Sequence, residues 1–121
     1  MIPATISLLV GTNVFSVALA DNPTAEAFAE RLPLAIEMTD LHHNEKYADL
    51  DEALPFKPEK VGRIETGDVM LFGDDCLVVF YKSFDTPWTY TRIGKIENTA
   101  GLPAAVGSGA VKVSFKEKNE Q

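Results

Sequence analysis

The sequence has a single cysteine and few basic residues. Cys76 stands alone among 121 residues, which excludes an intrachain disulfide framework and a multi-cysteine zinc site. The 11 Lys and Arg residues are outnumbered by 18 Asp and Glu residues, and the resulting net charge of -7 repels phosphate backbones and anionic lipids. We therefore expect no nucleic-acid partner and no membrane partner.

The chain also lacks an apolar run of the ~20 residues that a membrane-spanning helix needs. Its N-terminal apolar stretch ends in Ala18-Leu19-Ala20, which resembles a signal-peptidase site, but no basic residue precedes Arg31 and residues 11–13 interrupt the stretch. Alternating apolar side chains instead predict a hairpin of strands 6–10 and 15–19. We expect a cytoplasmic protein, and an export segment upstream of this chain is the alternative.

The amino-acid composition of the chain is that of one globular domain. Hydrophobic residues make up 45% of the chain and charged residues 24%, which is typical of a folded protein, and a chain of 121 residues has room for one hydrophobic core. We assign residues 1–116 to a single domain and residues 117–121 to a charged C-terminal tail. We expect a monomer or a weak homodimer.

The clearest local pattern is a helix that begins at Asn22-Pro23. Asn22 can accept a backbone N–H as a cap, and Pro23 loses no hydrogen bond at the first helical position. One apolar stripe follows at helical spacing, formed by Ala25, Phe28, Ala29 and Leu32. Pro33 ends the helix, and a second, short helix is expected at residues 102–106.

Short apolar segments predict about eight strands. Besides the first hairpin, they are residues 34–38, 61–65, 69–72, 76–81, 90–96 and 111–115. Residues 76–81 are apolar on both faces, which predicts a strand covered on each side. Residues 39–60 hold no long periodic pattern and are predicted to form an ordered loop. Many strands with one clear helix and one or two short helical turns predict a mainly β protein, a closed antiparallel barrel, because closure removes exposed strand edges.

Some polar residues have the types that bind metals or react. His42 and His43 lie with Asp40 and Glu45, but adjacent side chains on an extended segment point apart and there is no second cluster. A polar loop is therefore favoured, and we expect no metal site and no cofactor. Cys76 has no basic neighbour, which predicts a buried structural thiol.

An aromatic-rich segment, residues 80–90, is the best candidate for ligand binding. Trp88 lies in a predicted loop where an indole has no obvious core to enter, and aromatic groups near a rim can line a groove. Arg92 follows in a strand, where its guanidinium could reach a carboxylate or a carbonyl. The alternative is that Trp88 covers one end of the barrel and Arg92 pairs with a surface acid.

Several short motifs occur in one order along nearly the whole chain. They are DNPTA at 21–25, LPL at 32–34, NEKY at 44–47, GDVMLFG at 67–73, LVVFY at 77–81, YTRIG at 90–94 and GSG at 107–109. In this combination the chain resembles the bacterial cyclophilin-like proteins, a family of unassigned function distantly related to the cyclophilin peptidyl-prolyl isomerases. The resemblance implies an eight-stranded antiparallel barrel of cyclophilin-like type, flanked by helices.

The chain departs from the motifs that the cyclophilin resemblance implies for catalysis. It has no Phe-His-Arg, and Glu65-Thr66-Gly67-Asp68 stands where a Gln-Gly-Gly-Asp is expected. We therefore expect a peptide-binding or small-ligand-binding module. Its predicted groove residues are Glu65, Phe72, Trp88 and Tyr90. One alternative is a divergent prolyl isomerase that acts through Arg92 or Arg63, and another is an accessory interaction domain.

Overall fold

The computed structural model describes residues 4–118, which form eleven strands and two helices. In chain order these are β1 (Thr5–Val10), β2 (Asn13–Leu19), α1 (Pro23–Ala29), β3 (Leu34–Leu41), β4 (Glu45–Asp49), β5 (Glu59–Lys60), β6 (Arg63–Ile64), β7 (Asp68–Phe72), β8 (Cys76–Phe80), β9 (Phe84–Asp85), β10 (Thr89–Ile96), α2 (Leu102–Val106) and β11 (Val111–Glu117). Of the tail predicted at 117–121, residues 119–121 lie outside the described residues. Neither helix in the described part of the chain is long and apolar enough to cross a membrane.

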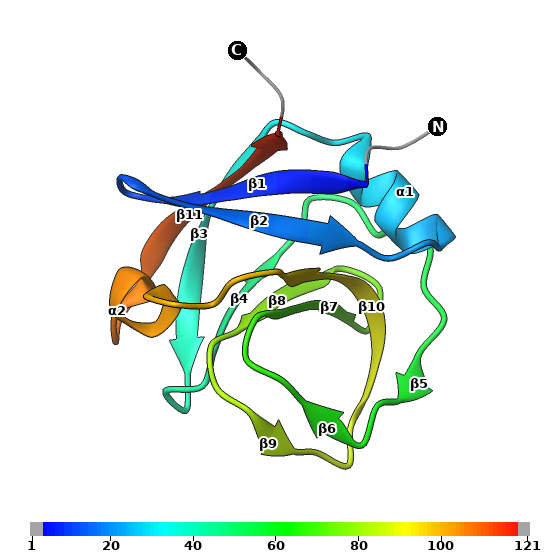
Figure 1. The fold of residues 1–121 in the computed structure, drawn as a ribbon. Helices are drawn as coiled ribbons and strands as arrows, with labels where there is room; N and C mark the ends of the chain where they lie inside the picture. Colours follow the sequence, from blue (N-terminus) through cyan, green and yellow to red (C-terminus); the bar gives the residue numbers. More distant parts are fainter. Residues whose placement is uncertain (1–3, 119–121) are drawn as a thin grey trace.

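Eight of these strands close into an antiparallel barrel (Figure 1). Neighbours follow the order β2-β1-β11-β3-β4-β8-β7-β10, and β10 returns to β2 by pairing Gly94 with Leu19. The predicted fold class is therefore confirmed. The closure requires Gly94, because a Cβ there would lie 2.6 Å from the backbone oxygen of Ala18.

Both predicted helices are present. Asn22 Oδ1 accepts a hydrogen bond from the Ala25 N–H at 2.7 Å, which is the capping contact that the sequence predicts. Phe28 packs its ring edge-on against Phe115 of β11, with ring centroids 5.2 Å apart, and this contact joins α1 to the barrel. The helix ends at Ala29, so Leu32 lies beyond it in the turn that precedes β3.

The prediction of a loop over residues 39–60 is wrong in part. β3 extends to Leu41, and β4 lies between β3 and β8 in the barrel. The pattern of β4 is hidden because one of its two inward positions is occupied by a charged residue, Lys46, whose side chain is fully buried, and the other by the small Ala48. By contrast, residues 61–65 contribute only the two-residue strand β6, which pairs with β9 outside the barrel. The eight barrel strands thus include β4 rather than the segment 61–65.

The apolar residues form two clusters on opposite faces of the sheet. The larger cluster draws on strands all around the barrel and is its interior. The smaller one, called here the outer cluster, contains Ile64, Met70, Val78, Phe80 and Tyr90. Side chains alternate between the two along β7 and β8, so β8 is buried on both faces as predicted. In Figure 1, β6 and β9 lie on the side of the molecule away from β1 and α1.

Candidate functional site

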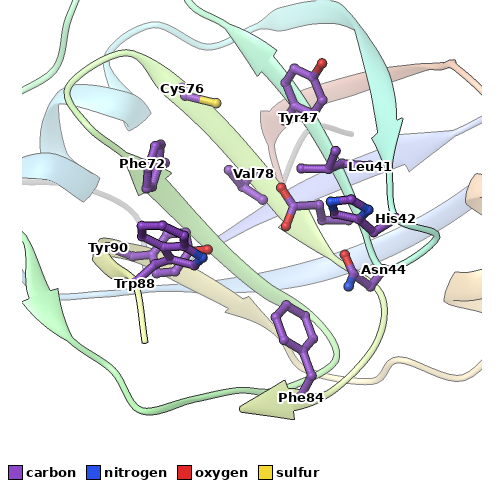
Figure 2. Close-up of a pocket in the computed structure, with 11 residues that line it drawn as sticks. Leu41, His42, Asn44, Tyr47, Phe72, Cys76, Val78, Phe84, Trp88 and Tyr90 are labelled. Atoms are coloured by element: carbon purple, nitrogen blue, oxygen red, sulfur yellow. The ribbon is translucent and has the colours of Figure 1, made fainter. Parts of the chain in front are cut away.

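A pocket of about 460 Å³ opens on the outer cluster. Its lining residues come from β3 and the turn after it, from β4, β7 and β8, and from the segment 84–90; they are Leu41, His42, Asn44, Glu45, Tyr47, Phe72, Cys76, Val78, Phe84, Trp88 and Tyr90. Figure 2 shows Phe72, Trp88 and Tyr90 on one side and Leu41, His42 and Asn44 on the other, with Val78 between them. We call this site the aromatic pocket.

The aromatic side of the pocket is held by ring contacts. Phe72 and Tyr90 pack with ring centroids 5.6 Å apart, and Tyr90 packs edge-on against buried Phe80 at 5.5 Å. Phe72 nevertheless remains 45% exposed and Trp88 61% exposed. The Trp88 backbone N–H donates to Thr86 Oγ1 at 3.2 Å, which fixes the loop that carries the indole. Large apolar surface is therefore presented at the rim of a concave site.

The opposite side is a tight turn between β3 and β4. His42 and His43 both have a φ of 57°, and the Asn44 N–H donates to the Leu41 carbonyl at 3.2 Å, which is the pattern of a type I′ turn. Histidine adopts this conformation at a cost, since the turn favours Asn and Gly. The His43 N–H donates to Asp40 Oδ2 at 3.0 Å and helps to hold the turn.

Glu45 brings an ionisable group into this apolar site. Its side chain is partly buried, and burial together with the negative charge of Asp40 raises the pKa of the Glu45 carboxyl to about 7. Beside it, the buried Asn44 Oδ1 has no hydrogen-bond partner within residues 4–118. The pocket therefore combines apolar walls with an ionisable carboxyl.

Lys46 lies on the other face of β4 and anchors the strand. Its ammonium donates to Asp40 Oδ1 at 3.1 Å, to the Gly107 carbonyl at 2.9 Å and to the Gly109 carbonyl at 2.5 Å. Tyr81 also donates its hydroxyl hydrogen to Asp40 Oδ1. The Tyr81 contact, with help from Lys46, lowers the pKa of Asp40 to about 2. Asp40 is thus a permanent anion near Glu45 at neutral pH.

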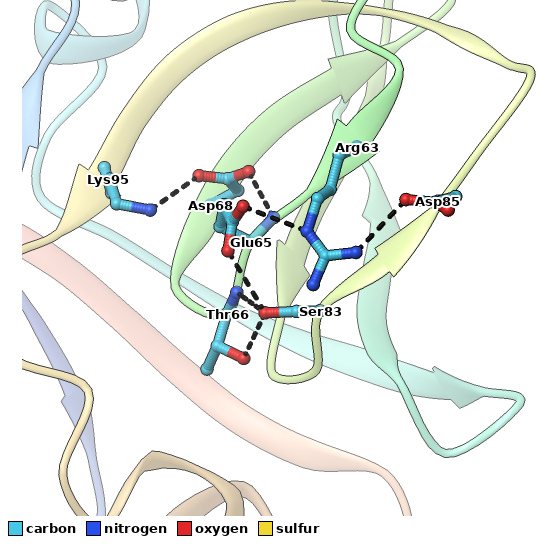
Figure 3. A network of polar contacts seen from close by, with 7 residues as sticks. All are labelled: Arg63, Glu65, Thr66, Asp68, Ser83, Asp85 and Lys95. Atoms are coloured by element: carbon cyan, nitrogen blue, oxygen red, sulfur yellow. Dashed lines mark hydrogen bonds and ion pairs between the residues drawn. The ribbon is translucent and has the colours of Figure 1, made fainter.

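Three of the four predicted groove residues meet at this pocket, namely Phe72, Trp88 and Tyr90. Glu65 instead belongs to a polar network on the surface (Figure 3), where Ser83 Oγ lies 3.4 Å from Glu65 Oε1 and 2.8 Å from the Thr66 backbone nitrogen. The Glu65 N–H itself donates to Asp68 at 2.9 Å. These contacts organise the turn that precedes β7.

The two arginine candidates lie away from the aromatic pocket. Arg63 is part of the network in Figure 3, with its guanidinium 3.2 Å from Glu65 and 3.1 Å from Asp85. Arg92 lies 3.9 Å from Glu59 and lines separate depressions near α1 and β2. Within the described residues, neither arginine is among those that line the aromatic pocket.

The sequence indicates Glu45 only as a possible metal ligand beside Asp40, His42 and His43, and does not predict that it lines the pocket. Within residues 4–118 no three His, Cys, Asp or Glu side chains are placed to hold a metal ion. His42 lines the pocket, whereas His43 Nδ1 lies 3.6 Å from Asp40. Had β4 been recognised as a strand, its alternation would have placed Glu45 on the same face as Tyr47. Cys76, predicted to be buried, is partly exposed at the pocket.

Comparisons with known proteins agree with the fold. No curated protein matches the chain. A solved structure, that of a hypothetical protein from Archaeoglobus fulgidus, is similar with a TM-score of 0.60 and 17% sequence identity, over 96% of this chain and 95% of that one. This similarity is one of fold, and it is to an archaeal protein; a bacterial origin stays a prediction. The model of the cyclophilin-like family matches residues 8–116, and the chain therefore belongs to the cyclophilin-like family.

Proposed function

We propose that the protein is a ligand-binding module whose binding site is the aromatic pocket. One observation carries this proposal: Phe72 and Trp88 are 45% and 61% exposed, yet both line a concavity of about 460 Å³. Pockets for small ligands usually measure about 300–1,000 Å³ and have mostly apolar walls with a few polar groups. A peptide segment or small apolar ligand that covers these rings would gain roughly 25 cal/mol for each Å² of apolar surface removed from water.

The geometry favours binding over prolyl isomerisation. An isomerase needs a donor placed on the amide that twists in the transition state, and a positioned cationic donor is the group that the cyclophilin resemblance implies. Arg63 and Arg92 both pair with carboxylates outside the pocket, and the ionisable groups near its wall include Glu45, a carboxyl. The other alternative, an accessory interaction domain, would bind a protein partner through the same exposed rings, so the test below examines the surface that it would use.

The test uses the single tryptophan, Trp88, as a reporter at the pocket rim. The tetrapeptide Ala-Ala-Pro-Phe and the alcohol 4-phenyl-1-butanol are titrated into the protein while Trp88 fluorescence and backbone amide NMR shifts are followed. We expect saturable shifts at Phe72, Val78 and Tyr90. Phe72→Ala should weaken binding by about tenfold, because it removes an aromatic wall.

Phe56→Ala is the matched control. Phe56 is 55% exposed and lies outside the aromatic pocket, beside Pro55 and Lys57 in a separate depression, so its truncation removes a similar ring. Equal effects of the two substitutions, or shifts that map away from the pocket, would contradict the proposal. A parallel isomerisation assay on the same peptide separates the enzyme from the binding module: acceleration lost in Arg92→Ala or Arg63→Ala would favour the isomerase.

A further inference from the structure

We propose that the aromatic pocket selects ligands that carry a protonated amine on an apolar body, with the Glu45 carboxylate as counter-ion. This inference rests on the proposed function and names its ligand class. Two features of the described residues support it: the placement of Glu45 in the pocket and the aromatic side of the same pocket.

The carboxylate of Glu45 has no cation of its own. Within residues 4–118 it takes part in no ion pair or hydrogen bond, and its charge is opposed by burial and by Asp40. The adjacent lysine cannot serve it, because Lys46 points to the other face of β4 and gives its three protons to Asp40, Gly107 and Gly109. A carboxylate taken out of water is stabilised by a cation within hydrogen-bond distance, and a ligand ammonium would supply that cation.

The polar end of the ligand decides how well it matches this carboxylate. An ammonium carries three N–H groups and can donate to Glu45, whereas a carboxylate ligand has no donor and would meet the charge of Glu45.

The rest of the pocket suits the other end of such a ligand. Trp88 and Phe72 present exposed ring surface, which would contact an apolar body and attract cations through the ring faces, and Tyr90 packs against Phe72. The net charge of -7 raises the local concentration of cationic molecules around the whole protein. Apolar contact and charge thus favour the same ligand class.

The titratable groups around Glu45 come from several elements. His42 in the turn, Tyr47 on β4, Cys76 on β8 and Tyr90 on β10 line the pocket with it. The charge of Asp40 on β3 also acts on Glu45, and His43 lies 3.6 Å from Asp40. The charge of Glu45 contributes to raising the pKa of both Cys76 and Tyr90, which keeps those two groups neutral at pH 8. Glu45, whose carboxyl has a pKa of about 7, therefore changes charge between pH 6 and pH 8.

The experiment compares three probes that differ only in their polar end: 4-phenylbutylamine, 4-phenyl-1-butanol and 4-phenylbutyrate. At pH 8 we expect the amine to bind at least about tenfold more tightly than the alcohol and the carboxylate to bind most weakly. Because the carboxyl has a pKa of about 7 in the free pocket, lowering the pH to 6 should weaken amine binding by about tenfold. The affinity for the alcohol should not fall.

Variants assign the effect to Glu45. Glu45→Gln should remove both the preference for the amine and its pH dependence while the alcohol still binds. Glu65→Gln is the matched carboxylate control, since Glu65 lies outside the pocket, and it should leave both unchanged. His42→Asn tests the nearby histidine with a residue that tolerates the same positive φ, and it should retain the pH step.

The outcomes separate this inference from the proposed function. Equal affinities for amine and alcohol at pH 8, or a pH step that survives in Glu45→Gln, would overturn the amine preference while the pocket remains a binding site. If none of the three probes shifts the resonances of Phe72, Val78 and Tyr90 at millimolar concentration, both the ligand class and the proposed site are wrong.

Discussion

The Lys46 ammonium lies 3.1 Å from the Asp40 carboxylate, and this ion pair joins two adjacent barrel strands next to the C-terminal end of α2. Lys46 is fully buried, yet each of its protons has an acceptor. Its ammonium also lies 5.3 Å from the centre of the Tyr81 ring. The pair therefore holds β3, β4 and the chain after α2 in one arrangement.

Lys46→Met should lower the free energy of unfolding by about 3 kcal/mol, because it leaves Asp40 without its cation and two carbonyls without a donor. Urea denaturation followed by circular dichroism measures this change. Lys112→Met on β11 is the control, since Lys112 is exposed, and it should alter stability by less than about 0.5 kcal/mol. Equal decreases in the free energy of unfolding of the two variants would show that the buried ion pair stabilises the protein no more than an exposed lysine does.

Asp40 should control the acid side of the stability profile. Its pKa is lowered from 3.8 to about 2 in the folded protein, chiefly by the Tyr81 hydroxyl, so its contribution is present above pH 4 and is lost as the pH falls towards 2. Asp40→Asn should therefore be less stable than the wild type at pH 6, and its stability should fall less steeply between pH 4 and pH 2. Parallel slopes for the two proteins would contradict this assignment.

Glu45 should act in the opposite direction. In the folded protein the pKa of Glu45 is about 7, above its ordinary value of 4.5. The stability of the protein is therefore highest below pH 4.5, where Glu45 is protonated, and falls as the pH rises through 7 and the buried carboxyl ionises. Glu45→Gln should remove this loss and stabilise the ligand-free protein at pH 8 by about 1 kcal/mol, an amount reduced by the solvent that reaches the side chain. Thermal melts at pH 5 and pH 8 check the difference between the two proteins.

Gly94→Ala should destabilise the barrel by about 2 kcal/mol or more, because the new methyl group would meet backbone atoms of Ala18 where β10 and β2 close the sheet. Gly109→Ala is the matched control: its Cβ would have open space, and its φ is not positive. Urea denaturation should therefore separate the two glycine variants clearly. A stable Gly94→Ala would mean that the barrel closure can widen without cost.

Cys76 should react slowly with alkylating reagents. Burial, with the nearby acidic groups Asp49, Glu45 and Asp75, raises the pKa of its thiol to about 11. At pH 8.5 the reactive thiolate should therefore be about a hundredfold scarcer than in an ordinary thiol. Iodoacetamide labelling, followed by mass spectrometry, measures the rate against free cysteine. A rate equal to that of free cysteine would contradict the shift.

The sequence predicts those parts of the fold in which local pattern and tertiary environment agree. The β1–β2 hairpin, the Asn22 cap and the two-sided burial of β8 all follow from the spacing of apolar and capping residues. β4 is missed because one of its two inward residues is Lys46, whose burial depends on Asp40 and on two carbonyls more than sixty residues away. Such acceptors are invisible to any local pattern.

The candidate site shows the same division. Trp88 indicates the site from sequence, because a large aromatic residue in a predicted loop has no obvious core to enter. Phe72 and Tyr90, which end and begin predicted strands, line the same pocket. The prediction of Glu65 as a groove residue rests on its place in a motif and is not matched by the structure, in which Glu65 belongs to the network with Ser83 and Arg63. The importance of Glu45 depends on the burial of its carboxyl and on the charge of Asp40, both of which are properties of the folded chain.

Along β4, β7 and β8, successive side chains point alternately into the barrel interior and towards the pocket. Leu71 and Leu77 pack inside, whereas Phe72 and Val78, one residue further along, line the pocket. Substitutions at outward positions can therefore change the pocket while the inward residues keep the barrel folded. A library of variants could be made in this way at Tyr47, Phe72 and Trp88. The same barrel interior can therefore carry different sets of outward side chains.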